Sequence, residues 1–231
     1  MNIQETEVES QISLIETAFL PYNITFLHTP SMRNWAVNAS WSGSDRQFRE
    51  MKSALHLGDY RSLNLYFRHV DDPAWGGTCT NPWTEKEYWG TPLPRLLLDD
   101  GCVVNDLTVP GSAHEYMNLG KTAIHEIGHW FGLFHVHEAG DVRNGLNPPD
   151  TCWIGNPDDW VEDTPKMRAV GIGKCDKTQN SCAEGKGEKE IFDPVDNYMS
   201  YASDECMARF TDGQRERMWA IYEAYRRGVP Y

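Results

Sequence analysis

Hydrophobic residues recur along the first half of the chain at two spacings, one typical of helices and the other typical of strands. Apolar positions three and four residues apart predict amphipathic helices over residues 4–18 and 45–57. The helical spacing returns near the C-terminal end, where Thr211 and Gln214 have the pattern of a capping box that opens a last helix. Alternating apolar and polar positions predict a sheet, with strands at 22–29, 35–41, 63–67 and 99–109.

The second half of the chain shows little of either periodicity. Residues 136–196 are rich in Gly, Pro and Asp and hold three of the six cysteines, so we expect an irregular segment held by disulfides. Before it, a helix is expected to begin near Asn118. This order of elements predicts an α+β fold. We expect one domain over residues 1–231, with an N-terminal subdomain over about 1–135 and a C-terminal subdomain over about 136–231.

The composition is that of an ordinary folded protein, with 40% hydrophobic and 24% charged residues among 231. The formal net charge of −13 disfavours binding to nucleic acid and to an anionic membrane surface. It favours cationic substrates or bound divalent cations, and it equally fits the solubility of a secreted protein. No apolar run approaches the roughly twenty residues of a membrane helix, so we expect no membrane segment.

The six cysteines contain no C-x-x-C pair, which favours three disulfides in an oxidising compartment over a zinc finger. Six cysteines allow about fifteen connectivities. The simplest first pair is Cys79 with Cys102, which would close a loop rich in Pro, Gly and Trp over residues 71–95. Glycosylation sequons at Asn23 and Asn38 agree with secretion.

The first thirty residues lack the basic start and apolar run of a secretory leader, because glutamates interrupt them at positions 5, 7, 9 and 16. We therefore expect the mature portion of a secreted protein, whose targeting segment and any propeptide are missing from this chain. Residence in the cytoplasm is the alternative.

Residues 125–135 read H-E-x-x-H-x-x-G-x-x-H and concentrate the candidate chemistry. On a helix, His125 and His129 lie about 6 Å apart on one face, which suits two imidazole nitrogens that bind one tetrahedral zinc. His135 reaches the same metal only if the helix stops, and Gly132 can adopt a left-handed turn without a Cβ penalty. The spacing predicts a bent three-histidine zinc site with its fourth position open.

Glu126 follows the first histidine and is expected to face the open side of the metal. Zinc lowers the pKa of a bound water to roughly 7, so that a neighbouring carboxylate can accept its proton as general base. A buried helix with ordinary histidines is the alternative for H-E-x-x-H alone, and the glycine and third histidine in register argue against it. His137 follows His135 by two residues, but the motif spacing favours His135 as the ligand.

A second motif, the DPVDNYMSY at 193–201, contains Met199. Together with HEIGHWFGLFH, the DTP at 163–165, Cys182 and Cys206, it resembles the pappalysin family of metzincin metalloendopeptidases, in particular its compact secreted microbial members. The similarity spans roughly residues 95–227. It implies a metzincin-like zincin fold: a twisted mixed sheet and the active-site helix in the N-terminal half, then a mostly irregular, disulfide-stapled half that ends in a helix.

Carried over to this chain, the resemblance implies zinc ligation by the three histidines of the motif, with Glu126 as general base. Met199 would form the methionine turn, a hydrophobic base beneath the histidines. Tyr201 would help to stabilise the tetrahedral intermediate, since a phenolic hydroxyl can donate to an oxyanion; simple packing is the alternative for this residue. The family's cysteine pattern implies two further disulfides, Cys152–Cys182 and Cys175–Cys206.

The resemblance also implies two finer features. Asp204 and Glu205 lie where the family builds the wall of the pocket for the side chain after the scissile bond, so a carboxylate there would favour Arg or Lys. Family members bind calcium after the third histidine, and solvated loop acids are the alternative here. The oxygen ligands on offer are Asp150, Asp158, Asp159, Glu162, Asp163 and the carbonyl of Thr164.

We therefore predict a secreted zinc-dependent endopeptidase that hydrolyses peptide bonds in proteins. A secreted zinc-containing binding module or toxin without catalysis is one alternative. The intact Glu126 argues against it, because a structural zinc needs no general base and usually has four protein ligands. A zinc hydrolase or amidase that acts on small substrates is another alternative, because the sequence does not reveal the shape of the cleft.

Overall fold

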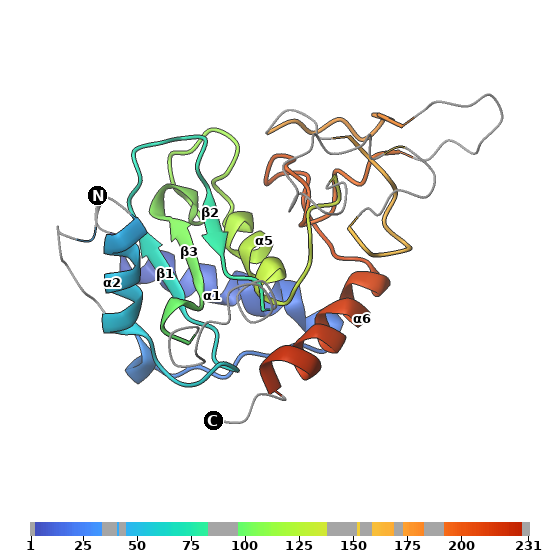
Figure 1. Cartoon of the computed structure of the whole chain (residues 1–231). Helices are drawn as coiled ribbons and strands as arrows, with labels where there is room; N and C mark the ends of the chain where they lie inside the picture. Colours follow the sequence, from blue (N-terminus) through green and yellow to red (C-terminus); the bar gives the residue numbers. More distant parts are fainter. Residues whose placement is uncertain are drawn as a thin grey trace.

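The computed structural model describes residues 3–33, 41, 45–82, 97–137, 152, 159–168, 173–182 and 192–227. The sheet lies on one side of helix α5, and much of the irregular second half lies on the other (Figure 1). The regular elements are α1 (Glu5–Phe19), α2 (Asp45–Leu55), β1 (Leu65–Arg68), β2 (Gly77–Cys79), β3 (Cys102–Asn105), α5 (Lys121–Trp130) and α6 (Asp212–Ile221). Short 3-10 turns occupy Leu20–Tyr22, Pro30–Met32 and Asp106–Thr108, and a π-helical stretch, Tyr222–Arg227, continues α6.

The described strands form a mixed sheet in the order β1–β3–β2. β1 runs parallel to β3, with Leu65 opposite Cys102, and β2 runs antiparallel to β3, with Cys79 opposite the same Cys102. A disulfide joins Cys79 and Cys102 at this paired position. All four residues of β3 are buried, as expected for a central strand that is covered on both faces.

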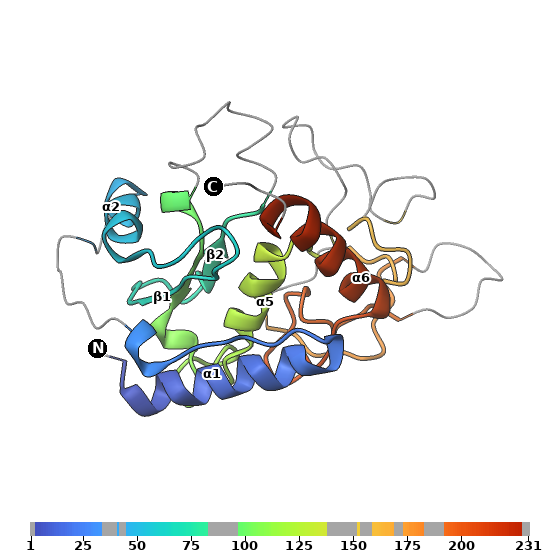
Figure 2. The same ribbon diagram turned by 90° about the horizontal axis from the view of Figure 1, so that it is seen from below.

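Helices cover both faces of the sheet. On one face, α1 and α5 pack with β3 in the main core, where Phe19, Ile124 and Val104 are fully buried. On the other face, α2 covers a smaller cluster that includes Met51 and Val103. Figure 2 shows α1 on one side of the sheet and α2 on the opposite side. Full burial of each such side chain stabilises the fold by about 1.5–3 kcal/mol. Helix α5 lies at the centre of the fold, because it contacts α1, β2 and β3.

Two predicted helices are confirmed with small shifts. The segment 4–18 forms α1, and the segment 45–57 forms α2, which ends before Gly58 with its left-handed φ of 81°. The predicted helix near Asn118 begins three residues later, at Lys121, because Gly120 has a φ of 76° and interrupts the helical backbone.

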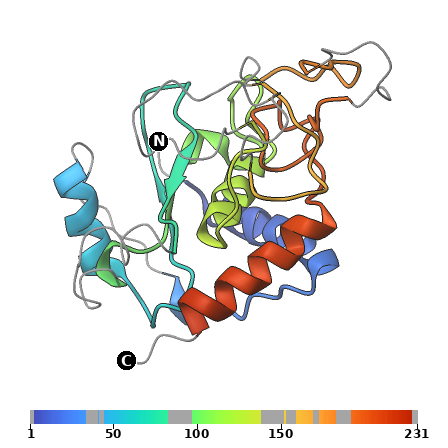
Figure 3. The same ribbon diagram turned by 45° about the vertical axis from the view of Figure 1, so that its right-hand side comes forward.

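The predicted strand at 22–29 is wrong. After α1 the chain makes a 3-10 turn, and residues 24–29 pair with no strand. Ile24 and Phe26 pack into the core instead, as in the edge-to-face contact of Phe26 with Phe19, whereas Leu27 is exposed. The Tyr22 hydroxyl donates to the Phe210 carbonyl (3.0 Å) and accepts from the Phe210 N–H (2.8 Å), and Figure 3 shows α6 running past this end of α1.

The remaining strand predictions have mixed outcomes. The segment 63–67 contains the start of β1, whereas only the centre of 99–109 pairs, as β3. β3 ends because the Asn105 side chain accepts from the Leu107 N–H and opens a 3-10 turn. Of the strand expected at 35–41, all but Trp41 lies outside the described residues.

The second half is irregular where it is described. Between α5 and α6, the described residues contain one isolated β-bridge, Asn197 with Arg209, and no longer ladder. Disulfides join Cys152 to Cys182 and Cys175 to Cys206. Within the described ranges, no helix has the length and apolar character needed to cross a bilayer.

The C-terminal helix is capped at its start and tied to the rest of the fold at its other end. At its start, Thr211 Oγ1 accepts from the Gln214 N–H (3.1 Å) and Gln214 Oε1 accepts from the Thr211 N–H (2.9 Å), which confirms the predicted capping box. At the other end, the fully buried Arg226 pairs with the buried Asp100 at 2.9 Å and donates to the carbonyl of Trp130 at 3.0 Å. Trp130 is the last residue of α5, so α6 and its π-helical extension hold that helix in place.

Candidate active site

Helix α5 ends in a motif that reverses the chain. Gly132 has a φ of 92°, its N–H donates to the carbonyl of His129 (2.8 Å), and the Leu133 N–H donates to the carbonyl of Gly128 (2.9 Å). These two bonds are those of a Schellman motif, with glycine in the left-handed position. From α6, Arg217 Nε donates to the Gly132 carbonyl at 2.9 Å and fixes the turn from outside. The reversal brings the residues after Gly132 back beside the helix.

Gly132→Ala is expected to weaken zinc binding and to lower the free energy of unfolding by about 1–2 kcal/mol, because an L-residue is strained in this backbone conformation. Gly111→Ala is the matched control. Gly111 also has a positive φ, of 85°, and no atom lies within 4 Å of an added Cβ. Chemical unfolding should give similar losses for both variants, and competition with a chelator should show weaker zinc binding for Gly132→Ala alone. Equal zinc affinities would contradict the role of this turn.

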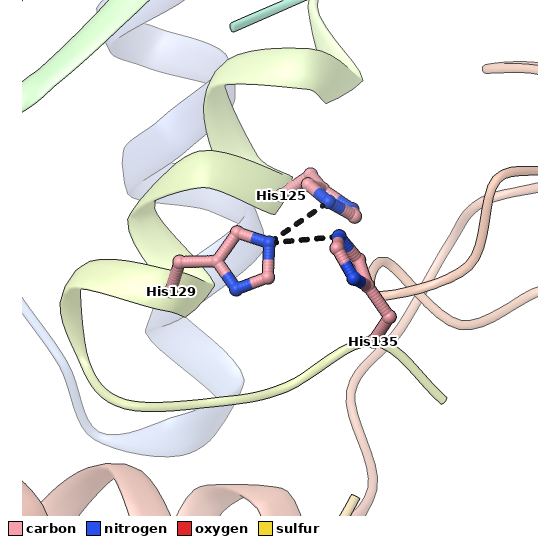
Figure 4. Close-up of side chains that lie close together, drawn as sticks. All are labelled: His125, His129 and His135. Atoms are coloured by element: carbon pink, nitrogen blue, oxygen red, sulfur yellow. Dashed lines mark hydrogen bonds between the residues drawn. The ribbon is translucent and has the colours of Figure 1, made fainter. Parts of the chain in front are cut away.

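Three imidazole rings converge beside α5 (Figure 4). The Nε2 atom of His129 lies 3.2 Å from Nε2 of His125 and 3.0 Å from Nε2 of His135. Tetrahedral zinc with nitrogen ligands at about 2.0–2.1 Å requires ligand atoms about 3.3 Å apart, so the spacing fits the metal. Among the described residues, these three form the one cluster of His, Cys, Asp or Glu that can hold a metal ion.

The buried surroundings keep the histidines ready to bind a cation. Burial lowers the pKa of both His125 and His135, and the neighbouring imidazoles lower it further, so the neutral form with a free lone pair is favoured. His125 Nδ1 lies 2.7 Å from the carbonyl of Tyr198, and His129 Nδ1 lies 2.8 Å from the carbonyl of Leu133. An Nδ1–H that donates to a carbonyl leaves the Nε2 lone pair for the metal.

Glu126 is buried on the sheet side of the same helix. Its side chain is 6% exposed, and burial raises the pKa of its carboxyl to about 8. Strand β2 lies against it, since a Cβ added at Gly77 would lie 2.9 Å from Glu126 Cγ and 3.1 Å from Oε1. The absence of a side chain at Gly77 therefore leaves room for the carboxylate.

Met199 lies beneath the histidine helix and is fully buried. A Cβ added at Gly128, between the first two histidines, would collide with the Met199 sulfur, so the helix and the turn approach closely. The Met199 carbonyl accepts from the Val136 N–H (3.2 Å), and its N–H donates to Asn197 Oδ1 (2.9 Å). The Asn197 amide in turn exchanges two hydrogen bonds, of 2.8 and 3.1 Å, with the amide of Gln214 in α6.

Tyr201 lies at the rim of the histidine cluster. Its hydroxyl oxygen is 3.1 Å from Nε2 of His135, and the two rings pack edge to face with centroids 4.7 Å apart. The hydroxyl therefore ends beside the position that a zinc ion would occupy. The structure brings together the three histidines, Glu126, Met199 and Tyr201 although Tyr201 follows the third histidine by 66 residues.

Comparison with known proteins agrees with this arrangement. The Peptidase M43 family model, described as pregnancy-associated plasma protein-A, matches residues 106–223. An extracellular metalloprotease of Podospora anserina is 34% identical over 231 residues, which cover 98% of this chain and 69% of that protein. An extracellular metalloprotease of Arthroderma otae is 35% identical over 227 residues, which cover 98% of this chain and 74% of that protein. This chain belongs to the pappalysin family.

Solved structures show the same fold. Mature mirolysin of Tannerella forsythia, in complex with a cleaved peptide, has a TM-score of 0.69 and 22% identity, and the match covers 96% of this chain and 85% of that one. A promirolysin mutant from the same organism has a TM-score of 0.71 and 23% identity, with coverage of 97% and 76%. The predicted metzincin-like α+β fold is confirmed, and this pappalysin is a metalloendopeptidase.

The two acidic residues of the expected specificity pocket have different surroundings. The carboxylate of Asp204 is buried, and its Oδ2 accepts from the N–H groups of Leu119 (2.7 Å) and Lys121 (3.3 Å) at the start of α5. Burial raises the pKa of Asp204, although these two bonds and the Lys121 charge oppose the shift. Glu205, one residue later, is exposed. Asp204 thus stabilises the N-terminus of the pappalysin helix that carries the histidines.

Three contacts that position this helix were missed from the sequence. Asp204 reaches α5 from 83 to 85 residues away. The fully buried Gln11 of α1 donates to the carbonyl of Gly120 (2.9 Å), and Arg217 of α6 reaches Gly132. A buried glutamine on the apolar face of α1 is a weak signal that a partner exists, but its spacing does not identify that partner.

Proposed function

We propose that residues 1–231 form the single catalytic domain of a secreted zinc endopeptidase, with the residues of its active site acting as follows. The observation that carries this proposal is the convergence of three Nε2 atoms, with contacts of 3.0 and 3.2 Å, next to the buried carboxylate of Glu126. His125, His129 and His135 would hold zinc, and Met199 would support them from below. A non-catalytic zinc module has no use for this buried carboxylate, whose desolvation is unfavourable.

The proposed mechanism uses each group for a different step. Zinc, when bound, supplies a Lewis acid that polarises the scissile carbonyl and acidifies a water. A carboxylate oxygen of Glu126 accepts a proton from the attacking water and later gives it to the leaving amine. The Tyr201 hydroxyl donates to the substrate carbonyl oxygen as negative charge develops there. The distance of 3.1 Å between this hydroxyl and His135 Nε2 supports the role, because it places the donor at the edge of the proposed metal site.

The position of β2 favours an extended peptide as substrate over a small molecule. β2 is an edge strand of the described sheet, and Gly77 within it lies against Glu126. Backbone groups at a sheet edge can pair with an extended peptide, which adds a strand to the sheet. A substrate bound in this way would pass directly beside the general base.

We propose a preference for Arg or Lys after the scissile bond. Asp204 Oδ1 is buried and has no hydrogen-bond partner among the described residues, and such an oxygen gains most from a cationic partner. Glu205 adds a second negative charge at the surface. Asp204→Asn keeps an oxygen for the start of α5 but removes the charge, so it should weaken the preference. Glu205→Gln tests the exposed carboxylate separately.

One digestion experiment tests both the reaction and the preference. A peptide library is incubated with the zinc-loaded protein, and the cleavage sites are read by mass spectrometry. We expect internal cuts that stop when 1,10-phenanthroline removes zinc and resume when zinc is restored. Basic residues should be enriched directly after the cut and lose that enrichment in Asp204→Asn. No cleavage by zinc-replete protein would overturn the enzyme function, whereas cleavage without a basic preference would overturn the pocket alone.

A structural calcium ion after the third histidine is a further proposal. Two expected ligands, Asp150 and Asp158, lie outside the described residues. Asp159 accepts from the Thr164 hydroxyl (2.7 Å), and Asp163 accepts from an N–H at the start of α6 (2.9 Å), so both carboxylates already stabilise turns. If calcium binds, adding it to chelator-treated protein should raise the melting temperature, and no rise would contradict the proposal.

We also propose that the enzyme is secreted and made as a precursor. Relatives are named extracellular metalloproteases, and three disulfides suit an oxidising compartment. Solved relatives include both a mature mirolysin and a promirolysin, which supports a propeptide ahead of this domain. The partners we propose are protein and peptide substrates, with no role for nucleic acid or membrane.

A further inference from the structure

His137 packs against the active site without belonging to the zinc cluster. Its ring stacks on that of His135, with centroids 5.0 Å apart and an angle of 12° between the planes. It also contacts the ring of Tyr201, with centroids 4.5 Å apart and an angle of 58°. Because Tyr201 and His135 contact each other at 4.7 Å, the three rings form a closed triangle.

The short segment after Gly132 places His137 on the same side as His135. After the Gly132 turn the chain alternates: Val136 is buried, and the two histidines that flank it are partly exposed. Val136 and His137 lie in a turn, and the stacked rings of His135 and His137 face the same side of the chain. The hydrogen bond from the Val136 N–H to the Met199 carbonyl holds this register against the methionine turn.

The position of His137 next to a metal ligand determines what role it can have. The metal-binding cluster of the described residues consists of His125, His129 and His135, so His137 contacts a ligand rather than supplying one. His125 and His129 are oriented by carbonyl groups 2.7 and 2.8 Å from their Nδ1 atoms. His135 comes after the end of the helix, and two aromatic rings lie against its imidazole. The plane of the His137 ring makes an angle of 12° with that of His135, and the plane of the Tyr201 ring makes an angle of 61° with it.

We propose that His137 is a positioning residue that holds His135 and Tyr201 against each other. This inference rests on the proposed function of both neighbours, one as a zinc ligand and the other as an oxyanion donor. A ring stacked on His135 restricts the rotation of that imidazole, and the same ring limits the movement of Tyr201. One side chain thereby preorganises a ligand and a donor, which reduces the entropy lost when either engages its partner.

The test compares His137→Ala, His137→Leu and His137→Phe with the wild-type protein. Zinc affinity is measured by competition with a chromophoric chelator. The kcat and KM are measured on a peptide that the wild-type protein cleaves. We expect His137→Ala and His137→Leu to bind zinc about tenfold more weakly, and to lose about tenfold in kcat with little change in KM. His137→Phe keeps a planar ring, so it should stay within about threefold of wild type on both measures. His28→Ala, at an exposed histidine, is the surface control.

Each outcome decides the proposal. Wild-type zinc affinity and kcat in His137→Ala would overturn it, and so would a loss in His137→Phe as large as in His137→Leu, because the ring would then not be the cause. If His137→Ala does not fold, the Phe and Leu variants still separate a planar ring from apolar volume. If the wild-type protein binds zinc but cleaves no peptide, the proposed function fails while the affinity series still tests the ring contact.

Discussion

Glu126→Gln is expected to reduce kcat by about a thousandfold or more while zinc stays bound and the fold stays intact. Glutamine fills the same buried space beside Gly77 but cannot accept the proton of the attacking water. General acid–base catalysis raises the rate by about 10²- to 10⁴-fold. Here the same carboxylate both accepts the proton and returns it. The decrease in kcat is measured by digesting a peptide and stopping samples at fixed times. Metal analysis after gel filtration measures the zinc content.

Glu115→Gln is the matched control for this change. Glu115 is exposed and precedes α5, so the same chemical substitution there should leave kcat and zinc content unchanged. Cleavage by Glu126→Gln at more than about a tenth of the wild-type rate would refute the general-base role. Loss of zinc from that variant would instead show that the carboxylate supports the metal site, and the assignment of a purely catalytic role would then be wrong.

Arg226→Met is expected to lower the free energy of unfolding by about 3–5 kcal/mol, because it leaves the buried carboxylate of Asp100 without its cation. Arg226 is fully buried, and all its guanidinium nitrogens donate hydrogen bonds. Two go to Asp100 (2.9 and 3.2 Å), and the others go to the carbonyls of Tyr60, Thr80 and Trp130. The guanidinium also lies 3.6 Å from the centroid of the Trp130 ring.

Arg227→Met is the control for this second prediction, because Arg227 is the next residue in the chain and is exposed. The Arg227 side chain is 65% exposed and pairs with Glu223 one turn away, an arrangement worth about 0.5 kcal/mol or less. Urea unfolding of both variants, followed by tryptophan fluorescence, gives the comparison. A loss below about 1 kcal/mol in Arg226→Met would contradict the view that this ion pair ties the C-terminal end to α5.

The candidate site was predictable in its chemistry because zinc coordination imposes spacing on the chain. His125 and His129 at four residues apart must share a helix face, and the glycine before His135 must reverse the backbone, as its φ of 92° does. The helical segments were predictable for a related reason, since an amphipathic helix that packs on one side shows its period directly in the sequence.

The strand predictions were weaker because pairing depends on a partner elsewhere in the chain. Residues 22–29 alternate as a strand does, yet Phe26 packs on Phe19 and no ladder forms in this segment. The segment around Cys102 alternates no better, but it lies between β1 and β2 and pairs with both. Alternation shows that side chains can face two ways, and only the fold decides whether another backbone is within reach.

Tertiary structure alone decided how the pappalysin site is held. The sequence by itself determined the zinc motif, the carboxylate that we propose as its general base and the bend between the second and third histidines, because each belongs to one short segment whose spacing is set by the geometry of a single metal. The contacts of Asp204 with the start of α5, of Arg217 with its end and of the His137 ring with Tyr201 could not be predicted in the same way. These contacts join segments brought together by packing, and the sequence carries no period or spacing that marks such pairs.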